Sequence, residues 1–289
     1  MAEKTLVKEW QSYGDFTRPP SSQNFDEPID MSLPLKVYTV PGCSACMRTK
    51  EFLTKHNVKF ISVNAFEDKQ AFEELAKIGV KRIPIAARGK HWADGQILRD
   101  LARVAGIKLE KEIKLSPEEL AERSNKVMSA ARNLAGRIPQ DELSVLLPGR
   151  PRSYKQLCVH IFQIFEMYLE LVEENKRFEF LSYLRDVPVD VTTVADVQRF
   201  GGEMQTRFNK WWQRAGRMAD FNAKADVYYG EVSLHHFFER TVWHSAHHTR
   251  QLQRIVQQLG FSVANGLKPE DLDGLPLPEG EYDDKVKLS

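Results

Sequence analysis

In the first third of the chain, short β-rich apolar runs alternate with amphipathic helical segments. The apolar run 35–40 is bounded by prolines, which predicts a buried strand. Pro41-Gly42 then predicts a turn, and a helix is expected from Cys43 to about His56. The same alternation of apolar and amphipathic segments predicts a strand at 58–65, a helix at 68–79, strands at 82–89 and 90–92, and a helix at 95–106. This β-α-β-α-β-β-α order predicts a small α/β domain over residues 34–110.

From about Ser116 the pattern changes to long helical segments. Ser116 is a typical N-cap, because Pro117 and two acidic residues follow it. Helices are predicted at 116–136, 153–175, 194–216 (weakened by Gly201-Gly202) and 231–260, with loops after 266. Four long helices joined by loops predict a four-helix bundle within a domain spanning 111–289. The polar residues 1–33 are interpreted as an N-terminal arm. The two predicted domains together give the fold class α/β plus all-α.

Composition narrows the class of protein. The 289 residues are 42% hydrophobic and 28% charged, which is enough apolar material for two cores and excludes a disordered or collagen-like chain. The 41 Lys+Arg nearly balance the 40 Asp+Glu, so we expect no nucleic-acid partner. No apolar stretch approaches ~18 residues, so no membrane partner is expected. Three cysteines and a charged beginning without a signal-peptide pattern favour a cytoplasmic location.

The motif Cys43-Ser44-Ala45-Cys46 lies where the first predicted strand meets a helix. Unpaired N–H groups and the helix dipole stabilise a thiolate at that position, so the pKa of Cys43 should fall below the free value of about 8.5. Cys46 follows one turn later and can close a disulfide. We therefore predict Cys43 as the attacking thiol and Cys46 as the resolving thiol. The alternative, half of a zinc knuckle, needs two more soft ligands, and the sequence has no second CxxC.

The stretch LKVYTVPGCSACMRTKEFL, followed by RIPI, resembles glutaredoxin-like redoxins over about residues 34–107. The segment GKHWADG is similar to one in the redoxins that serve ribonucleotide reductase. The resemblance implies a thioredoxin fold, with Pro84 as a cis-proline facing the CxxC and Ile83 offering its backbone to the substrate. It also implies a disulfide substrate and a reductase or thiol pool for recycling. Glutathione stays open as the low-molecular-weight thiol, because the chain lacks the Gly-Gly-x-x-Asp pattern that helps to hold it.

Three histidines form a second candidate site. On the predicted helix 231–260, His248 falls inside the apolar stripe and His244 at its edge, whereas His247 falls further round, near Arg240. His160 lies beside the buried stripe of the helix 153–175. Histidines at i and i+4 can share one metal ion, and three protein ligands with an open position are the catalytic zinc pattern. Zinc is the first choice of divalent metal, while Fe, Ni and Cu also suit imidazole. The alternative is a set of hydrogen-bonded histidines without a metal.

The stretches LCVHIFQIFEMYL and WHSAHHTRQLQ resemble DinB-like metalloproteins over about residues 115–265. The resemblance implies a four-helix bundle with His160, His244 and His248 as metal ligands. Many such proteins resemble thiol-dependent transferases or isomerases, and a homodimer is a further implied possibility.

Both candidate sites handle sulfur, which leads to a two-module hypothesis. The bundle would use a metal to activate a thiol against a small electrophile, and the redoxin module would reduce or resolve the product. One alternative is a plain disulfide oxidoreductase whose bundle is a docking or dimerisation module. Another is a metal-dependent hydrolase or isomerase with a redox-sensing redoxin domain.

Overall fold

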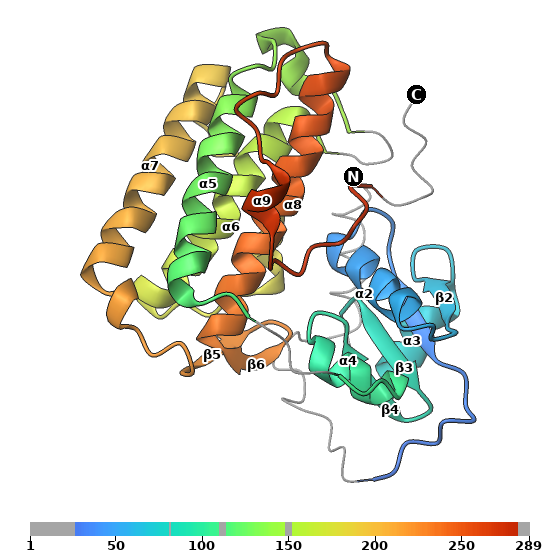
Figure 1. Ribbon diagram of the computed structural model, residues 1–289. Helices are drawn as coiled ribbons and strands as arrows, with labels where there is room; N and C mark the ends of the chain where they lie inside the picture. Colours follow the sequence, from blue (N-terminus) through green and yellow to red (C-terminus); the bar gives the residue numbers. More distant parts are fainter. Residues whose placement is uncertain (1–26, 81, 110–113, 148–151, 283–289) are drawn as a thin grey trace. The chain divides into compact units, whose positions relative to one another are not determined.

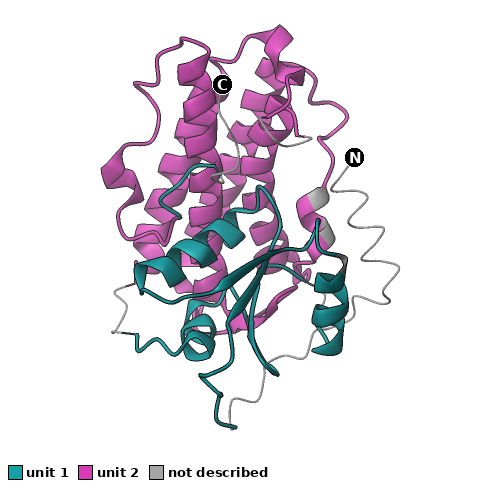
Figure 2. Ribbon diagram, turned by 90° about the vertical axis from the view of Figure 1, so that its right-hand side faces the viewer, with its two compact units in different colours: residues 1–112, 278–289 teal, residues 113–277 magenta. Residues whose placement is uncertain are grey.

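The computed structural model describes residues 27–80, 82–109, 114–147 and 152–282, which form two compact units (Figures 1 and 2). Most of the predicted N-terminal arm, residues 1–26, lies outside this range. The first unit comprises the described residues up to 109 together with 278–282, and the second comprises 114–277. The segment 278–282 was assigned by sequence to the bundle domain. In the first unit, the Glu51 carboxylate accepts hydrogen bonds from the backbone N–H groups of Glu279 (2.6 Å) and Gly280 (3.0 Å).

The first unit is built on a four-stranded sheet with the order β2-β1-β3-β4. Strand β1 runs parallel to β2 and antiparallel to β3, and β3 and β4 form an antiparallel hairpin. Gly89, with φ +60°, makes the hairpin turn in a conformation that favours glycine. The elements are β1 (Lys36–Thr39), α2 (Ser44–Lys55), β2 (Ile61–Asn64), α3 (Lys69–Lys77), β3 (Ile85–Arg88), β4 (His91–Asp94) and α4 (Leu98–Ala105).

Side-chain alternation along the strands gives this sheet two buried faces. Val37 packs in one core cluster with Leu53 of α2 and Leu101 of α4. The next residue, Tyr38, packs in the other cluster with Leu75 of α3. The result is the predicted thioredoxin-like βαβαββα arrangement. The strand expected at 82–89 is shorter than predicted and begins only after Pro84, because proline lacks the N–H that a strand ladder uses. The peptide bond between Ile83 and Pro84 is cis.

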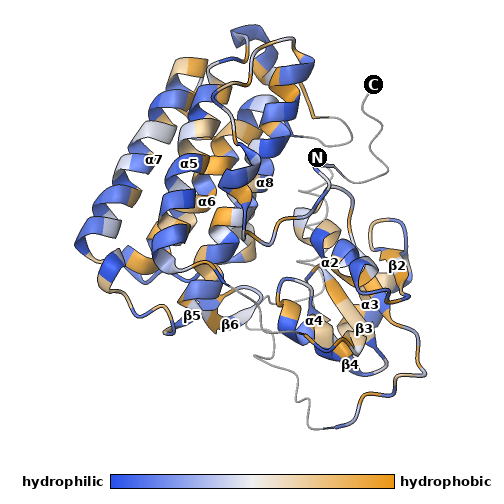
Figure 3. Ribbon diagram, viewed as in Figure 1, coloured by the Kyte–Doolittle hydropathy of each residue, from blue (hydrophilic) through white to orange (hydrophobic). Residues whose placement is uncertain are grey.

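In the second unit, four long helices pack together within the described residues (Figure 1). Helix α8 packs against α5 and α6, and α7 packs against the same two helices. Capping boxes at Ser116, Ser153 and Thr193 start α5, α6 and α7, as the sequence predicted for the first of them. Hydrophobic and hydrophilic residues alternate along these helices, as expected where one side is buried (Figure 3). The bounds are α5 (Pro117–Ala135), α6 (Tyr154–Glu174), α7 (Val194–Arg214) and α8 (Leu234–Gln258).

Two predictions for the second unit are wrong in detail. The helix expected from Glu231 begins at Leu234, because residues 230–233 instead pair with 224–227 as a hairpin and Ser233 caps the helix. The tail after 266, expected as loops, contains a short helix that starts at Pro269. The additional elements are the strands β5 (Lys224–Val227) and β6 (Gly230–Ser233), the helix α9 (Pro269–Leu272), and the 3-10 helices η1 (Gln140–Ser144), η2 (Phe180–Leu184) and η3 (Gly216–Met218).

Within the described part of the chain, none of the helices combines the length and the apolar character needed to cross a bilayer.

Candidate functional sites

Cys43 and Cys46 lie at the beginning of α2 and are joined by a disulfide, with their Cα atoms 5.2 Å apart. Cys43 is the N-cap of the helix, and its Sγ accepts a hydrogen bond from the backbone N–H of Cys46 at 3.1 Å. Cys43 is partly exposed, whereas Cys46 is fully buried. A substrate can therefore reach the sulfur of Cys43, while Cys46 is placed to act on what Cys43 has bound. The third cysteine, Cys158, is buried in α6, and burial raises its pKa to about 12.

Hydrogen bonds through Gly95 connect the loop that carries Pro84 to the end of β4 and to α2. The backbone N–H of Gly95 donates to the carbonyl of Pro84 at 3.0 Å, and the carbonyl of Gly95 accepts from the Thr49 hydroxyl at 3.2 Å. A Cβ on Gly95 would lie 3.0 Å from Pro84 Cγ and would overlap Thr49 Oγ1. Only glycine therefore lets the Pro84 loop approach the helix that begins at the disulfide.

A buried ion pair also joins the Pro84 loop to the end of β4. Arg82 Nε lies 2.7 Å from Asp94 Oδ2, and both side chains are buried. Burial raises the pKa of Asp94, and the attraction to Arg82 opposes that shift. The other oxygen of Asp94 accepts the backbone N–H of Gln96 at 2.9 Å. This pair was not predicted from the sequence, where GKHWADG entered only through a resemblance, because Arg82 lies in the loop before β3 and Asp94 at the end of β4.

The three predicted histidines converge inside the second unit. His160 comes from α6, and His244 and His248 come from α8. Their possible ligand atoms all lie within 4.8 Å of one another, and the side chains are 5%, 7% and 3% exposed, respectively. The two Nε2 atoms of His244 and His248 are 3.0 Å apart. Two nitrogen ligands at about 2.0–2.1 Å from a tetrahedral zinc would be about 3.3 Å apart, so the cluster fits a metal.

Gln251 fixes the orientation of one of these rings. Its Oε1 lies 2.7 Å from Nδ1 of His248 and can only accept, so this nitrogen carries the proton. The lone pair on Nε2 is then directed toward His244, in the tautomer that a metal ligand needs. Burial lowers the pKa of both His244 and His248 well below the ordinary value, and Arg240 lowers that of His244 further. Both imidazoles are therefore neutral near pH 7, which is the form that binds metal.

The structure also brings residues to this site that the sequence analysis did not select. His247 and Arg240, which the helical wheel placed away from the apolar stripe, are 1% and 3% exposed. Tyr183 of η2 lies over His244, with ring centroids 5.4 Å apart, and 6.1 Å from His160. Tyr228 packs against Tyr183, with ring centroids 5.7 Å apart. Helical periodicity could not predict that these residues belong to the site, because segments outside α8 bury them. These segments are η2 and the turn between β5 and β6.

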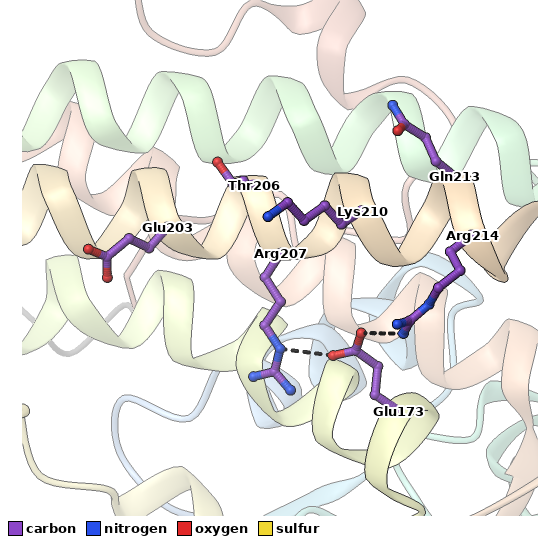
Figure 4. Close-up of a pocket in the computed structure, with 7 residues that line it drawn as sticks. All are labelled: Glu173, Glu203, Thr206, Arg207, Lys210, Gln213 and Arg214. Atoms are coloured by element: carbon purple, nitrogen blue, oxygen red, sulfur yellow. Dashed lines mark hydrogen bonds and ion pairs between the residues drawn. The ribbon is translucent and has the colours of Figure 1, made fainter.

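A separate depression of about 760 Å³ lies between α6 and α7 (Figure 4). Glu173 is about 20 Å along α6 from His160, at 1.5 Å per residue, so the depression is distinct from the histidine cluster. Its main contacts are partly exposed ion pairs from Glu173 to Arg207 (2.8 Å) and Arg214 (3.1 Å), a type that contributes little free energy. The lining residues are Glu173, Glu203, Thr206, Arg207, Lys210, Gln213 and Arg214.

Comparison with known proteins identifies the first unit. Residues 35–92 match the model of the glutaredoxin family. The chain is 36% identical over 44 residues to an uncharacterized glutaredoxin-like 8.6 kDa protein in the rubredoxin operon of Clostridium pasteurianum, covering 15% of this chain and 59% of that protein. It is 30% identical over 59 residues to the gene 56 protein of Mycobacterium phage L5, covering 20% of this chain and 57% of that protein. No solved structure matches the chain.

The chain thus spans less than two thirds of the length of either relative. Residues 35–92 form a glutaredoxin domain, followed by a helical region with a buried cluster of three histidines. A glutaredoxin domain with the Cys43–Cys46 pair implies thiol–disulfide oxidoreductase chemistry, and hence disulfide substrates and a thiol system that recycles the domain.

Proposed function

We propose that this protein is a two-module thiol enzyme, in which a disulfide oxidoreductase works together with a metal-dependent thiol transferase. The observation that carries the proposal is the buried convergence of His160, His244 and His248 in a chain that also holds the Cys43–Cys46 pair. Cys43 and Cys46 are the catalytic residues of the first module. The second module is a DinB-like four-helix bundle whose three histidines are metal ligands.

In the redoxin module, the reduced Cys43 thiolate attacks one sulfur of a substrate disulfide and displaces the other as a thiolate. The Cys46 thiolate then attacks Cys43 in the mixed disulfide and releases the second substrate thiolate. Two electrons pass from the cysteine pair to the substrate, and the Cys43–Cys46 disulfide remains. A dithiol reductase or a low-molecular-weight thiol pool, with glutathione as one candidate, reduces it again. Ile83 and Pro84 bind the substrate backbone beside the motif.

In the helical module, His160, His244 and His248 hold a divalent metal, for which zinc is our first choice. Such a cation stabilises the thiolate form of a bound thiol. Gln251 keeps the His248 ring oriented, and Tyr183 and Trp243 pack against His244 and restrict water. The module thereby presents a low-molecular-weight thiol to a small electrophile. Where the electrophile is itself a disulfide, attack by the bound thiolate displaces one thiolate and leaves a mixed disulfide, which the redoxin module reduces by the exchange described above.

The metal site is tested by elemental mass spectrometry of the wild type, His248→Ala and His56→Ala. His56 is an exposed histidine on the first unit and serves as the matched control. We expect stoichiometric metal in the wild type and in His56→Ala, and its loss in His248→Ala together with thiol-dependent turnover of a model electrophile. Absence of metal from the wild type, with disulfide exchange intact, would reject the transferase. Full turnover by His244→Ala would favour the plain oxidoreductase.

The assigned cysteine roles are tested by trapping. Cys46→Ser should accumulate a mixed disulfide on Cys43, visible as an added substrate mass in intact-protein mass spectrometry, whereas Cys43→Ser should form none. Both variants should retain the metal content of the wild type. A mixed disulfide on Cys46 in Cys43→Ser would reverse the assignment, and activity without any thiol would favour the hydrolase or isomerase.

A further inference from the structure

A buried cation lies next to the histidine cluster. Arg240 precedes His244 by one turn of α8 and is 3% exposed. Aromatic rings surround its guanidinium carbon, at 4.9 Å from the ring centroid of Tyr183, 5.3 Å from Tyr229 and 5.7 Å from Phe178. Tyr183 also lies over His244, so a single ring connects the guanidinium to the imidazole cluster.

The local charge at this place is positive. A guanidinium is always protonated, so Arg240 places a permanent, buried positive charge one turn of α8 from His244. A divalent metal on the three imidazoles would add two further charges. Positive charges held close together in a poorly hydrated region are mutually repulsive and attract an anion strongly.

We propose that Arg240 and Tyr183 form a subsite for the carboxylate of the low-molecular-weight thiol that the helical module uses. The inference rests on the proposed function, because the thiol sulfur would occupy the open metal position while its carboxylate meets Arg240. A planar guanidinium matches the two oxygens of a carboxylate, and ion pairing offsets the charge that burial makes unfavourable. The Tyr183 ring packs against the same guanidinium at 4.9 Å, and its phenolic O–H can donate to the same anion.

The test uses the full-length protein loaded with Co²⁺ and two small thiols, 3-mercaptopropionate and 3-mercaptopropionamide. The thiols are isosteric and differ in charge. Binding is followed by the thiolate-to-cobalt charge-transfer absorption, which reports affinity independently of turnover. In the wild type we expect the carboxylate thiol to bind at least about tenfold more tightly than the amide, the discrimination typical of a hydrogen bond to a charged group.

Arg240→Met should bring this affinity ratio close to unity while leaving the affinity for the amide thiol similar. Arg240→Lys, which keeps the charge but not the planar fork, should retain part of the ratio even if the Met variant does not fold. Arg254→Met, an exposed position on the same helix, is the matched control and should behave as the wild type. A wild-type ratio near unity, or one unchanged in both Arg240 variants, would overturn the subsite and leave the metal centre standing. Failure of the wild type to bind Co²⁺ would instead overturn the proposed function itself.

Discussion

At the scale of single residues, the histidine cluster depends on how each ring is oriented. His248 is held between Gln251, which accepts from its Nδ1, and His244, which faces its Nε2. Without the first contact, the ring could adopt the other tautomer or turn about its Cβ–Cγ bond. If His248 binds a metal as proposed, the Gln251 amide positions that ligand, and its effect on metal binding can be measured directly.

Gln251→Leu should weaken metal binding by about 10- to 100-fold, the usual cost of losing the hydrogen bond behind a ligating histidine. Competition with a chromophoric chelator measures the affinity of the full-length protein. Gln257→Leu, an exposed residue near the end of the same helix, should leave the affinity unchanged. Equal affinities for the two variants would show that Gln251 does not orient the ligand.

The metal-free protein should lose stability as the pH falls below about 6.5. Burial lowers the pKa of His244 and His248 in the folded state, so the unfolded chain binds more protons in this range. Well above pH 6.5 both states are neutral at these positions, and the two rings contribute no pH dependence. Below it, each ring contributes a loss of at most about 1.4 kcal/mol per pH unit until the pH reaches its folded-state pKa.

Thermal unfolding of the chelator-treated protein at pH 7.5 and pH 5.5 measures this effect. The pair His244→Gln/His248→Gln should show a smaller decrease in Tm between the two pH values than the wild type, because groups outside the cluster contribute equally to both. A decrease of the same size in both proteins would mean that the cluster is already charged, or that its protons are not linked to folding.

The sequence predicted the convergence of these rings because helical spacing and an apolar stripe determine which side chains face inward. It misplaced Arg240 and His247, since a helical wheel assumes that one side of a helix meets water. Here η2 and the turn between β5 and β6 cover that side with Tyr183, Tyr228 and Tyr229. Contacts between segments so far apart in the chain have no signature in the local pattern of any one of them.

At the scale of the elements, α7 shows why a rule for single residues can mislead. From the sequence, Gly201-Gly202 is expected to weaken this helix, because glycine is a poor helix former. The structure distinguishes the two glycines. A Cβ on Gly201 would lie only 2.5 Å from Phe162 Cζ, so α7 can approach α6 closely at that point only with glycine. A Cβ on Gly202 would meet the flexible end of Arg132 at 3.3 Å.

Gly201→Ala should therefore destabilise the protein by about 1–3 kcal/mol, the usual range for overpacking in a core. Gly202→Ala should be neutral or more stable by up to about 1 kcal/mol, because alanine favours the helix and the arginine can move aside. Denaturant unfolding of the two variants provides a matched comparison on one helix. Similar stabilities would indicate that Phe162 repacks and that the close approach is not required.

The types of the helices and strands could be predicted from the sequence, but their ends could not. Periodicity identified the four long helices and the alternation of the first unit, while the ends depend on particular caps and pairings. Helix α8 begins three residues later than expected, because the pairing of β6 with β5 competes with the helix for the backbone of residues 231–233. The strand β3 likewise begins after Pro84, which lacks the N–H that a ladder uses.

At the scale of the whole molecule, the two chemistries lie in separate compact units of one chain. The cysteine pair is at the beginning of α2, and the histidines are within α6 and α8. Each unit has its own core, so removing a reactive group from one should leave the structure of the other intact. If the units act in one cycle, what the chain supplies is proximity: a tethered partner acts at an effective concentration of millimolar order.

The effect of this proximity can be measured by mixing two variants, each of which lacks the reactive group of a different unit. Cys43→Ser retains the histidines, and His248→Ala retains the cysteine pair, so a mixture contains both activities on separate chains. At protein concentrations near 1 μM, the mixture should turn over a coupled reaction about 10²- to 10³-fold more slowly than the wild type, because the tethered concentration is millimolar. The rate per chain of the mixture should rise with protein concentration, whereas that of the wild type should not. A mixture as fast as the wild type would mean that the product of one unit diffuses freely to the other, and that the two units share a chain without sharing a cycle.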